Sequence, residues 1–61
     1  MNTLKELRKY ATEMMGEHPS IASEILDFYQ LACDEVEQGG SENHECELAY
    51  SDIQYIIDQE Q

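Results

Sequence analysis

The sequence predicts an all-α domain made of three helices, and three observations support this fold class. Apolar side chains recur at intervals of three and four residues in three separate segments, which is the spacing of one helix face. Residues 16–19 and Gly39-Gly40 interrupt this pattern, and glycine and proline are residues that end helices. The 61 residues are 41% hydrophobic, which is enough for a core, so residues 1–61 form a single domain.

The first helix is predicted over about residues 3–15. Thr3 and Glu6 have the spacing of a capping box, in which the hydroxyl and the carboxylate each accept a hydrogen bond from a free backbone N–H. We expect the helix to stop at Gly16. Its apolar side chains fall in one continuous arc of about 140°. They are Leu4, Leu7, Tyr10, Ala11, Met14 and Met15.

The second helix is predicted over residues 19–38. Pro19 suits a first helical turn and disfavours helical geometry at His18, so His18 or Ser20 should cap this helix. Gly39-Gly40 should end it. Its apolar arc of about 160° is wider than one neighbour requires, so helix two should be central. The arc comprises Ile21, Ala22, Ile25, Leu26, Phe28, Tyr29, Ala32, Cys33 and Val36.

The third helix is predicted over residues 42–59, with Ser41 or Asn43 as its N-cap. The short turn at Gly39-Gly40 should bring helices two and three together as an antiparallel hairpin. The apolar arc of helix three comprises Cys46, Ala49, Tyr50, Ile53, Ile56 and Ile57.

Charge is distributed very unevenly along the chain. The net charge is -11, every Lys and Arg lies within residues 5–9, and every acid except Glu6 lies between Tyr10 and Gln61. A surface of this sign repels a phosphate backbone, so we expect no direct binding to nucleic acid. Crowded carboxylates also repel one another, so we expect their pKa values in the folded state to be raised on average.

Three large apolar residues fall outside the apolar arcs. Leu31 lies on the acidic face of helix two, and Leu48 and Tyr55 lie on the outer face of helix three. We predict that these residues anchor a protein partner inside an acidic rim; the alternative is that they are scattered surface residues. The rim is predicted to consist of Glu24, Asp27, Asp34 and Glu35. A chain this short has a marginal core of its own, so we also expect a homodimer.

Two possible metal sites are weighed and set aside. Asp34 to Glu45 has the outer positions and the sixth-position glycine of a calcium loop, but with Val36 and Gln38 at positions three and five too few hard ligands converge. Four residues that could bind zinc lack the spacing of a zinc site. These are His18, Cys33, His44 and Cys46.

The remaining features predict a cytoplasmic protein that is not an enzyme and needs no cofactor. No apolar run approaches the roughly 18 residues of a membrane span, and MNTLKELRKY lacks the apolar core of a signal peptide. Two cysteines without paired spacing are expected as thiols, and we expect them to fill the core. The carboxylates should cover solvated faces, with no pocket in which to catalyse a reaction.

As a whole, MNTLKELRKYATEMMGEHPSIASEILDFYQLACDEVEQGG resembles the small accessory proteins encoded in the early region of lambdoid temperate phages. Such proteins are short, acidic or amphipathic, helical and non-enzymatic. The resemblance implies a role in redirecting host processes during infection, or in the choice between lysis and lysogeny, within the host cytoplasm. The resemblance assigns no functional role to any particular residue of this chain.

Three functions therefore remain open. The first is a modulator that binds a host or phage protein through its acidic and apolar surface. The second is a DNA mimic, because carboxylates on neighbouring helical turns stand about 5–6 Å apart, not far from the spacing of phosphates along a strand. The third is a structural dimer or assembly component.

Overall fold

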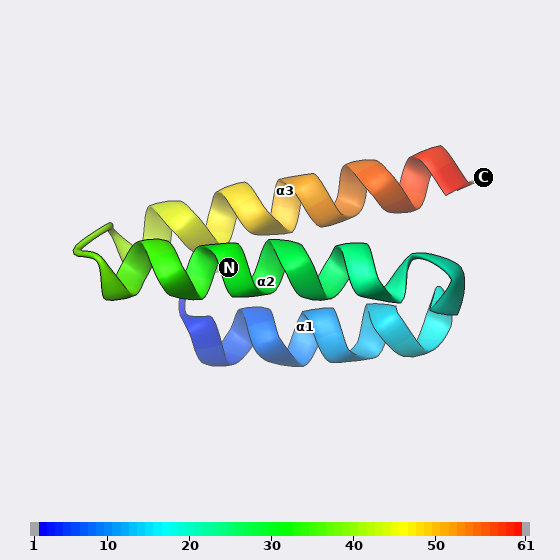
Figure 1. Ribbon diagram of the computed structural model, residues 1–61, viewed down its shortest axis with the longest axis horizontal. Helices are drawn as coiled ribbons and strands as arrows, with labels where there is room; N and C mark the ends of the chain where they lie inside the picture. The colour runs from blue at the N-terminus through cyan, green and yellow to red at the C-terminus, as the bar shows by residue number, and fades with distance from the viewer. Residues whose placement is uncertain (1, 61) are drawn as a thin grey trace.

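The computed structural model describes residues 2–60, which form three α-helices and one short 3-10 helix (Figure 1). This architecture confirms the predicted all-α fold with three helices. The elements in chain order are α1 (Leu4–Glu17), η1 (Pro19–Ile21), α2 (Ala22–Glu37) and α3 (Glu42–Glu60).

The start of α1 is fixed by the predicted cap. The Thr3 hydroxyl accepts a hydrogen bond from the backbone N–H of Glu6 at 3.2 Å. The Glu6 carboxylate accepts from the backbone N–H of Asn2 at 3.1 Å, one residue before the position expected in a capping box. The first bond satisfies an N–H group that the first helical turn would otherwise leave without a partner, and the second holds the residue before the cap against that turn.

The predicted end of the first helix at Gly16 is wrong, because α1 continues through Gly16 to Glu17. The residue that stops it is His18, whose φ of -129° and ψ of 66° are not helical. Pro19 causes this, since a proline ring clashes with helical geometry in the preceding residue. A glycine near the end of a helix is tolerated at a cost of about 1 kcal/mol relative to alanine.

The second predicted helix is divided in two. Residues 19–21 form η1, and α2 begins only at Ala22, after Ile21 with φ -117° and ψ 17°. Neither His18 nor Ser20 caps α2 with its side chain, contrary to our prediction. Both side chains instead bind the carboxylate of Glu60 at the far end of the chain.

The turn between α2 and α3 depends on its glycines. Gly39 has φ 104°, in a region that favours glycine, and its N–H donates to the Val36 carbonyl at 3.1 Å. The Gly40 N–H donates to the Glu35 carbonyl at 2.8 Å, which completes the end of α2 near its predicted position. Ser41 then caps α3, as one of the two predicted caps, by accepting from the His44 N–H at 3.3 Å.

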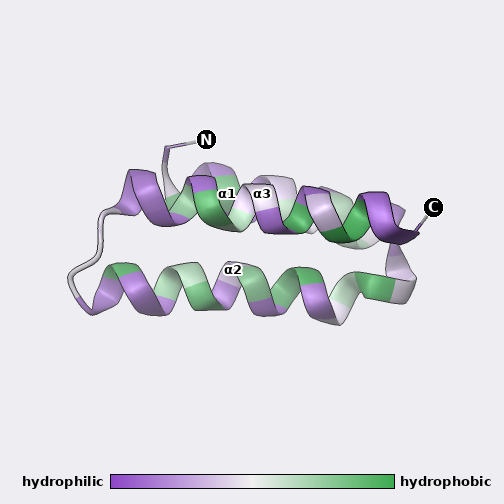
Figure 2. Cartoon of the chain, turned by 90° about the horizontal axis from the view of Figure 1, so that it is seen from above, coloured by the Kyte–Doolittle hydropathy of each residue, from purple (hydrophilic) through white to green (hydrophobic). Residues whose placement is uncertain are grey.

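The three helices pack side by side as a bundle with extents of 34 × 16 × 16 Å. Helix α2 runs antiparallel to α1 and α3, and the views in Figures 1 and 2 together place the three helices at the corners of a triangle. As predicted for the central helix, α2 contacts α1 and α3 more extensively than these two contact each other.

The core comes from the predicted apolar arcs of all three helices. Leu7, Ile25 and Ile53 are completely buried, one from each helix, and full burial of such a side chain contributes about 1.5–3 kcal/mol. The other buried residues are Ala11, Ala32, Cys46 and Ala49. Leu26, predicted to belong to the apolar arc of helix two, is instead 38% exposed. None of the helices within residues 2–60 has the length and hydropathy needed to cross a membrane.

Candidate functional site

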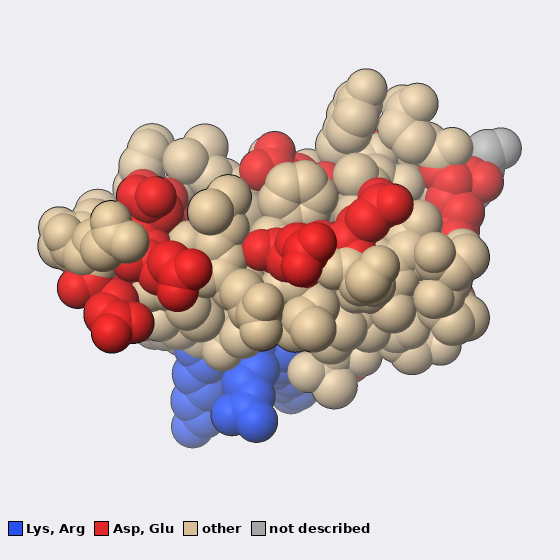
Figure 3. All heavy atoms as spheres, viewed as in Figure 1, with Lys and Arg blue, Asp and Glu red and all other residues tan. Residues whose placement is uncertain are grey.

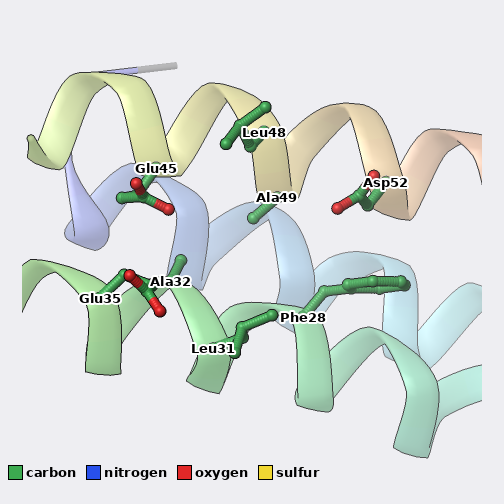
Figure 4. A pocket seen from close by; sticks show the side chains of 8 residues that line it. All are labelled: Phe28, Leu31, Ala32, Glu35, Glu45, Leu48, Ala49 and Asp52. Carbon is green, nitrogen blue, oxygen red and sulfur yellow. The ribbon is translucent and has the colours of Figure 1, made fainter. Parts of the chain in front are cut away.

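A shallow groove lies between α2 and α3, on the side of this helix pair that faces away from α1 (Figure 4). We call it the α2–α3 groove. Four residues from each helix line it: Phe28, Leu31, Ala32 and Glu35 from α2, and Glu45, Leu48, Ala49 and Asp52 from α3. Its volume of about 190 Å³ is below the roughly 300–1,000 Å³ of pockets that hold small ligands. It is large enough for a few side chains of another protein.

Helix periodicity and the turn between the helices bring these residues together. On each helix the lining positions follow the spacing i, i+3, i+4, i+7, which places them on one face. Because α2 and α3 are antiparallel, residues equally far from Gly40 in the sequence lie at the same level. Glu35 therefore lies level with Glu45 at one end, and Phe28 lies level with Asp52 at the other.

The middle of the groove is apolar. Leu31 and Leu48 are 57% and 48% exposed, while Ala32 and Ala49 are buried beneath them. Phe28 is half-buried and closes one end (Figure 4). Two exposed leucines above an alanine floor leave an apolar surface with room for a closely packed partner.

The ends of the groove are acidic. Glu35 and Glu45 lie at one end and Asp52 at the other (Figure 4). Within residues 2–60 the structure shows no salt bridge from a Lys or Arg side chain, so no Lys or Arg neutralises the three groove carboxylates. Figure 3 shows the Lys and Arg side chains at the edge formed by α1, away from the acids on the face of α2 and α3.

The structure brings together three of the seven predicted site residues. Leu31, Leu48 and Glu35 all line the α2–α3 groove. The residues that do not line it are Tyr55, Glu24, Asp27 and Asp34. Tyr55 is 64% exposed and lies two turns beyond Leu48 along α3, so it continues the same helix face past the end of the groove.

Sequence reasoning missed Glu45 and Asp52 as members of the site. The signal was the i, i+3, i+7 spacing of Glu45, Leu48 and Asp52, which matches the spacing of Phe28, Leu31 and Glu35 on α2. Counting residues from Gly40 in both directions could have placed these two sets of residues side by side across the hairpin. Phe28, Ala32 and Ala49 belong to the predicted apolar arcs, and in the structure they also form the floor and one end of the groove.

The cysteines have the properties of packing residues. Both are free thiols, with Cys46 buried and Cys33 half-buried. Burial raises the pKa of the Cys46 thiol, which is opposite to the change that activates a nucleophilic cysteine. Among the residues that the structure describes, no group of three or more His, Cys, Asp or Glu side chains could hold a metal ion.

Two carboxylates form hydrogen bonds that link the helices at the two ends of the bundle. The Glu42 carboxylate accepts from the backbone N–H of Leu4 at 2.7 Å, which joins the N-terminal ends of α1 and α3. At the other end, His18 Nδ1 lies 2.6 Å from Glu60 Oε1, and the Ser20 hydroxyl donates to Glu60 Oε2. We call this second contact the Glu60 clasp, and it joins the C-terminal end of α3 to the junction between α1 and α2.

The clasp changes the acidity of Glu60. The hydrogen bond from Ser20, and then that with His18, hold the pKa of the Glu60 carboxyl below its usual value. The backbone N–H of Asn2 likewise lowers the pKa of Glu6. Both shifts are opposite to the expected rise, because the hydrogen-bond donors lower these two pKa values by more than desolvation raises them.

No protein-family model matches the chain, and no curated protein or solved structure is significantly similar to it.

Proposed function

We propose that this protein is a non-enzymatic binding protein that recognises another protein through the α2–α3 groove. The observation that carries the proposal is the position of Leu31 and Leu48, both about half exposed, above a floor of alanines and between unpaired carboxylates. Exposed apolar residues gathered in a hollow with a polar rim are typical of protein interaction sites.

The proposed biological setting rests on the resemblance to early-region accessory proteins of lambdoid temperate phages. In that setting the protein acts in the host cytoplasm. It binds a host or phage protein and changes that protein's activity, with no reaction of its own. The small helical architecture and the net charge of -11 are compatible with such a modulator.

The groove favours this function over DNA mimicry and over a structural dimer. A DNA mimic presents charges in place of phosphates, whereas two leucines occupy the centre of the groove. In a two-fold symmetric dimer the same patch meets itself. Pairing through the groove would then oppose Glu35, Glu45 and Asp52 of one copy to acids of the other, which like-charge repulsion disfavours.

Comparative affinity capture from a bacterial lysate tests the proposed function. The wild-type protein and the double variant Leu31→Ser/Leu48→Ser are immobilised, and the captured proteins are identified by mass spectrometry. Leu26→Ser is the matched control, because Leu26 is also an exposed leucine of α2 but does not line the groove. Wild type and control should retain a specific protein that the double variant loses. Identical capture by all three would refute a role for the groove.

The identity of the captured protein separates modulation from mimicry. If that protein binds DNA, the complex is challenged with duplex DNA at increasing salt. A DNA mimic should compete with the duplex for the same basic site, and its binding should weaken steeply as salt screens the charges. A flat salt response would count against mimicry.

A further inference from the structure

We infer that the α2–α3 groove accepts a basic amphipathic helix of its partner protein. The inference rests on the proposed function, because it takes the groove as the binding surface. It adds the secondary structure and the charge of the segment that binds.

The shape of the groove favours a helix. Helices α2 and α3 form an antiparallel pair, and α1 packs on one side of this pair while the groove lies on the other. A fourth helix could pack there as α1 does, with side-chain ridges inserted between those of the pair. The buried Ala32 and Ala49 on the floor would allow its backbone to approach closely.

The length of the groove sets the spacing of the apolar anchors on that helix. From Phe28 to Glu35, α2 advances by two turns, or about 10 Å at 1.5 Å per residue. A helix across the same distance presents apolar residues at i, i+3 or i+4, and i+7. These anchors would contact Leu31 and Leu48 and bury the surface that both leucines now expose.

The charge around the groove favours a basic helix. Carboxylates lie at both ends, Glu35 and Glu45 at one and Asp52 at the other, with no Lys or Arg of the described chain paired to them. Lys and Arg side chains have long apolar stems that can cover leucine while their charged heads reach carboxylates. Lys or Arg residues flanking the anchors would thus match both the apolar centre and the acidic ends.

A second copy of this chain fits the groove less well. Its only Lys and Arg residues are Lys5, Arg8 and Lys9, and all three lie on the exposed face of α1. The apolar residues of that helix, such as Leu7 and Ala11, are buried in its own core. A second copy could therefore offer cations without apolar anchors beside them.

A synthetic peptide provides the direct test. The probe is a capped peptide of about four helical turns, with leucines at i, i+4 and i+7 and with lysine and alanine elsewhere. It is titrated into the full-length ¹⁵N-labelled protein and followed by two-dimensional NMR. One control peptide has the same composition with its leucines scattered around the helix, and a second has glutamate in place of every lysine.

Binding in the groove should shift the amide signals of residues 28–35 and 45–52, with the exposed face of α1 unaffected. Far-UV circular dichroism of the mixture should exceed the sum of the separate spectra, because a short peptide gains helix when it binds. Equal binding of the scattered peptide, or no gain of helix, would overturn the assignment of a helix. Equal binding of the glutamate peptide would overturn the assignment of a basic partner.

Charge variants separate the groove from general acidity. The variant Glu35→Gln/Glu45→Gln/Asp52→Asn removes the three groove charges. Its matched control, Glu13→Gln/Glu37→Gln/Glu47→Gln, removes three exposed charges outside the groove. The groove variant should raise the Kd of the basic peptide about tenfold, and the control by less than about twofold at moderate salt. Equal effects would show attraction to overall charge and would overturn the inference.

The outcomes also distinguish this inference from the function on which it rests. If no peptide binds but lysate capture still depends on Leu31 and Leu48, the inference fails and the proposed function stands. If capture is also independent of both leucines, both fail. Self-association that Leu31→Ser/Leu48→Ser abolishes, measured by sedimentation, would assign the groove to a second copy and overturn the inference.

Discussion

At the scale of single residues, the leucines of this protein fall into two classes. Leu7 is completely buried, whereas Leu31 and Leu48 are 57% and 48% exposed. A side chain that keeps half of its surface in water gains only about half of the full hydrophobic contribution from folding, since that contribution follows the buried apolar area. Burial by a partner could therefore give the two groove leucines about as much free energy again.

This difference in burial predicts effects of different size when these residues are substituted. Leu31→Ser and Leu48→Ser should each change the free energy of unfolding by less than about 1 kcal/mol, as surface substitutions do. Ile53 is completely buried, so Ile53→Val should cost about 0.5–1.5 kcal/mol and Ile53→Ala about 2–5 kcal/mol. Urea denaturation followed by circular dichroism measures these values. A loss for Leu31→Ser as large as that for Ile53→Ala would show that Leu31 stabilises the fold.

At the scale of the elements, helix boundaries depend on backbone geometry as much as on residue type. Gly16 lies inside α1 and Gly39 lies in the turn after α2, although both interrupt the apolar pattern in the same way. The difference is Pro19, which fixes the end of α1 through His18. After α2 no proline follows, and the positive φ of Gly39 makes the turn.

The two glycines should consequently respond in opposite ways to alanine. An added Cβ at Gly16 meets no atom within 4 Å, so Gly16→Ala should stabilise the protein by about 0.5–1 kcal/mol through helix propensity. Gly39 has φ +104°, so Gly39→Ala should destabilise it by at least about 1 kcal/mol. Thermal melts of both variants measure these changes in stability. Destabilisation by Gly16→Ala would indicate that the first helix ends at Gly16.

The Glu60 clasp, which joins α3 to the junction between α1 and α2, predicts that the stability of the protein depends on pH. The folded-state pKa of Glu60 is lowered by Ser20 and His18, so its contribution to stability is present above the usual carboxyl pKa and is lost as pH falls through the lowered value. Wild type should therefore be more stable than Glu60→Gln at neutral pH, and the difference should disappear on acidification. The exposed Glu13→Gln is the control.

Direct titration of Glu60 provides a second check on the clasp. Ser20→Ala removes the donor with the largest effect on this carboxyl, so the Glu60 pKa should rise toward its usual value. The side-chain carboxyl signal followed by NMR reports that pKa. An unchanged pKa in Ser20→Ala, or parallel pH curves for wild type and Glu60→Gln, would contradict the clasp.

At the scale of the whole molecule, the net charge of -11 acts on folding and on binding in opposite directions. The acids repel one another in the compact state, and the structure pairs none of them with Lys or Arg within residues 2–60. Salt screens this repulsion and should stabilise the fold. The same screening should weaken attraction to a basic partner.

We therefore expect the Tm to rise with salt while the affinity for the basic peptide falls. Raising NaCl from about 0.01 M to about 0.5 M shortens the screening length several-fold. Each 1 kcal/mol gained would raise the Tm of a domain of this size by about 4–8 °C. Differential scanning calorimetry gives the Tm, and a lower Tm at high salt would indicate that specific ion pairs support the fold.

The sequence by itself determined the features that depend on near neighbours. Thr3 and Ser41 cap their helices, and Gly39 makes the turn, because each acts on backbone groups within a few residues. The apolar arcs predicted the core for the same reason, since helix periodicity is local. Periodicity also predicted that Leu31, Leu48 and Tyr55 would be exposed.

The tertiary structure alone decided what depends on contacts between distant segments. Ser20 binds Glu60 instead of capping a helix, because packing brings the end of α3 to that junction. Likewise, Leu31 and Leu48 line one groove together with Glu45 and Asp52 because α1 covers the other side of the α2–α3 pair and leaves this side open. Helix periodicity determines the face of its own helix on which each residue lies. The packing of the three helices determines which of these faces come together.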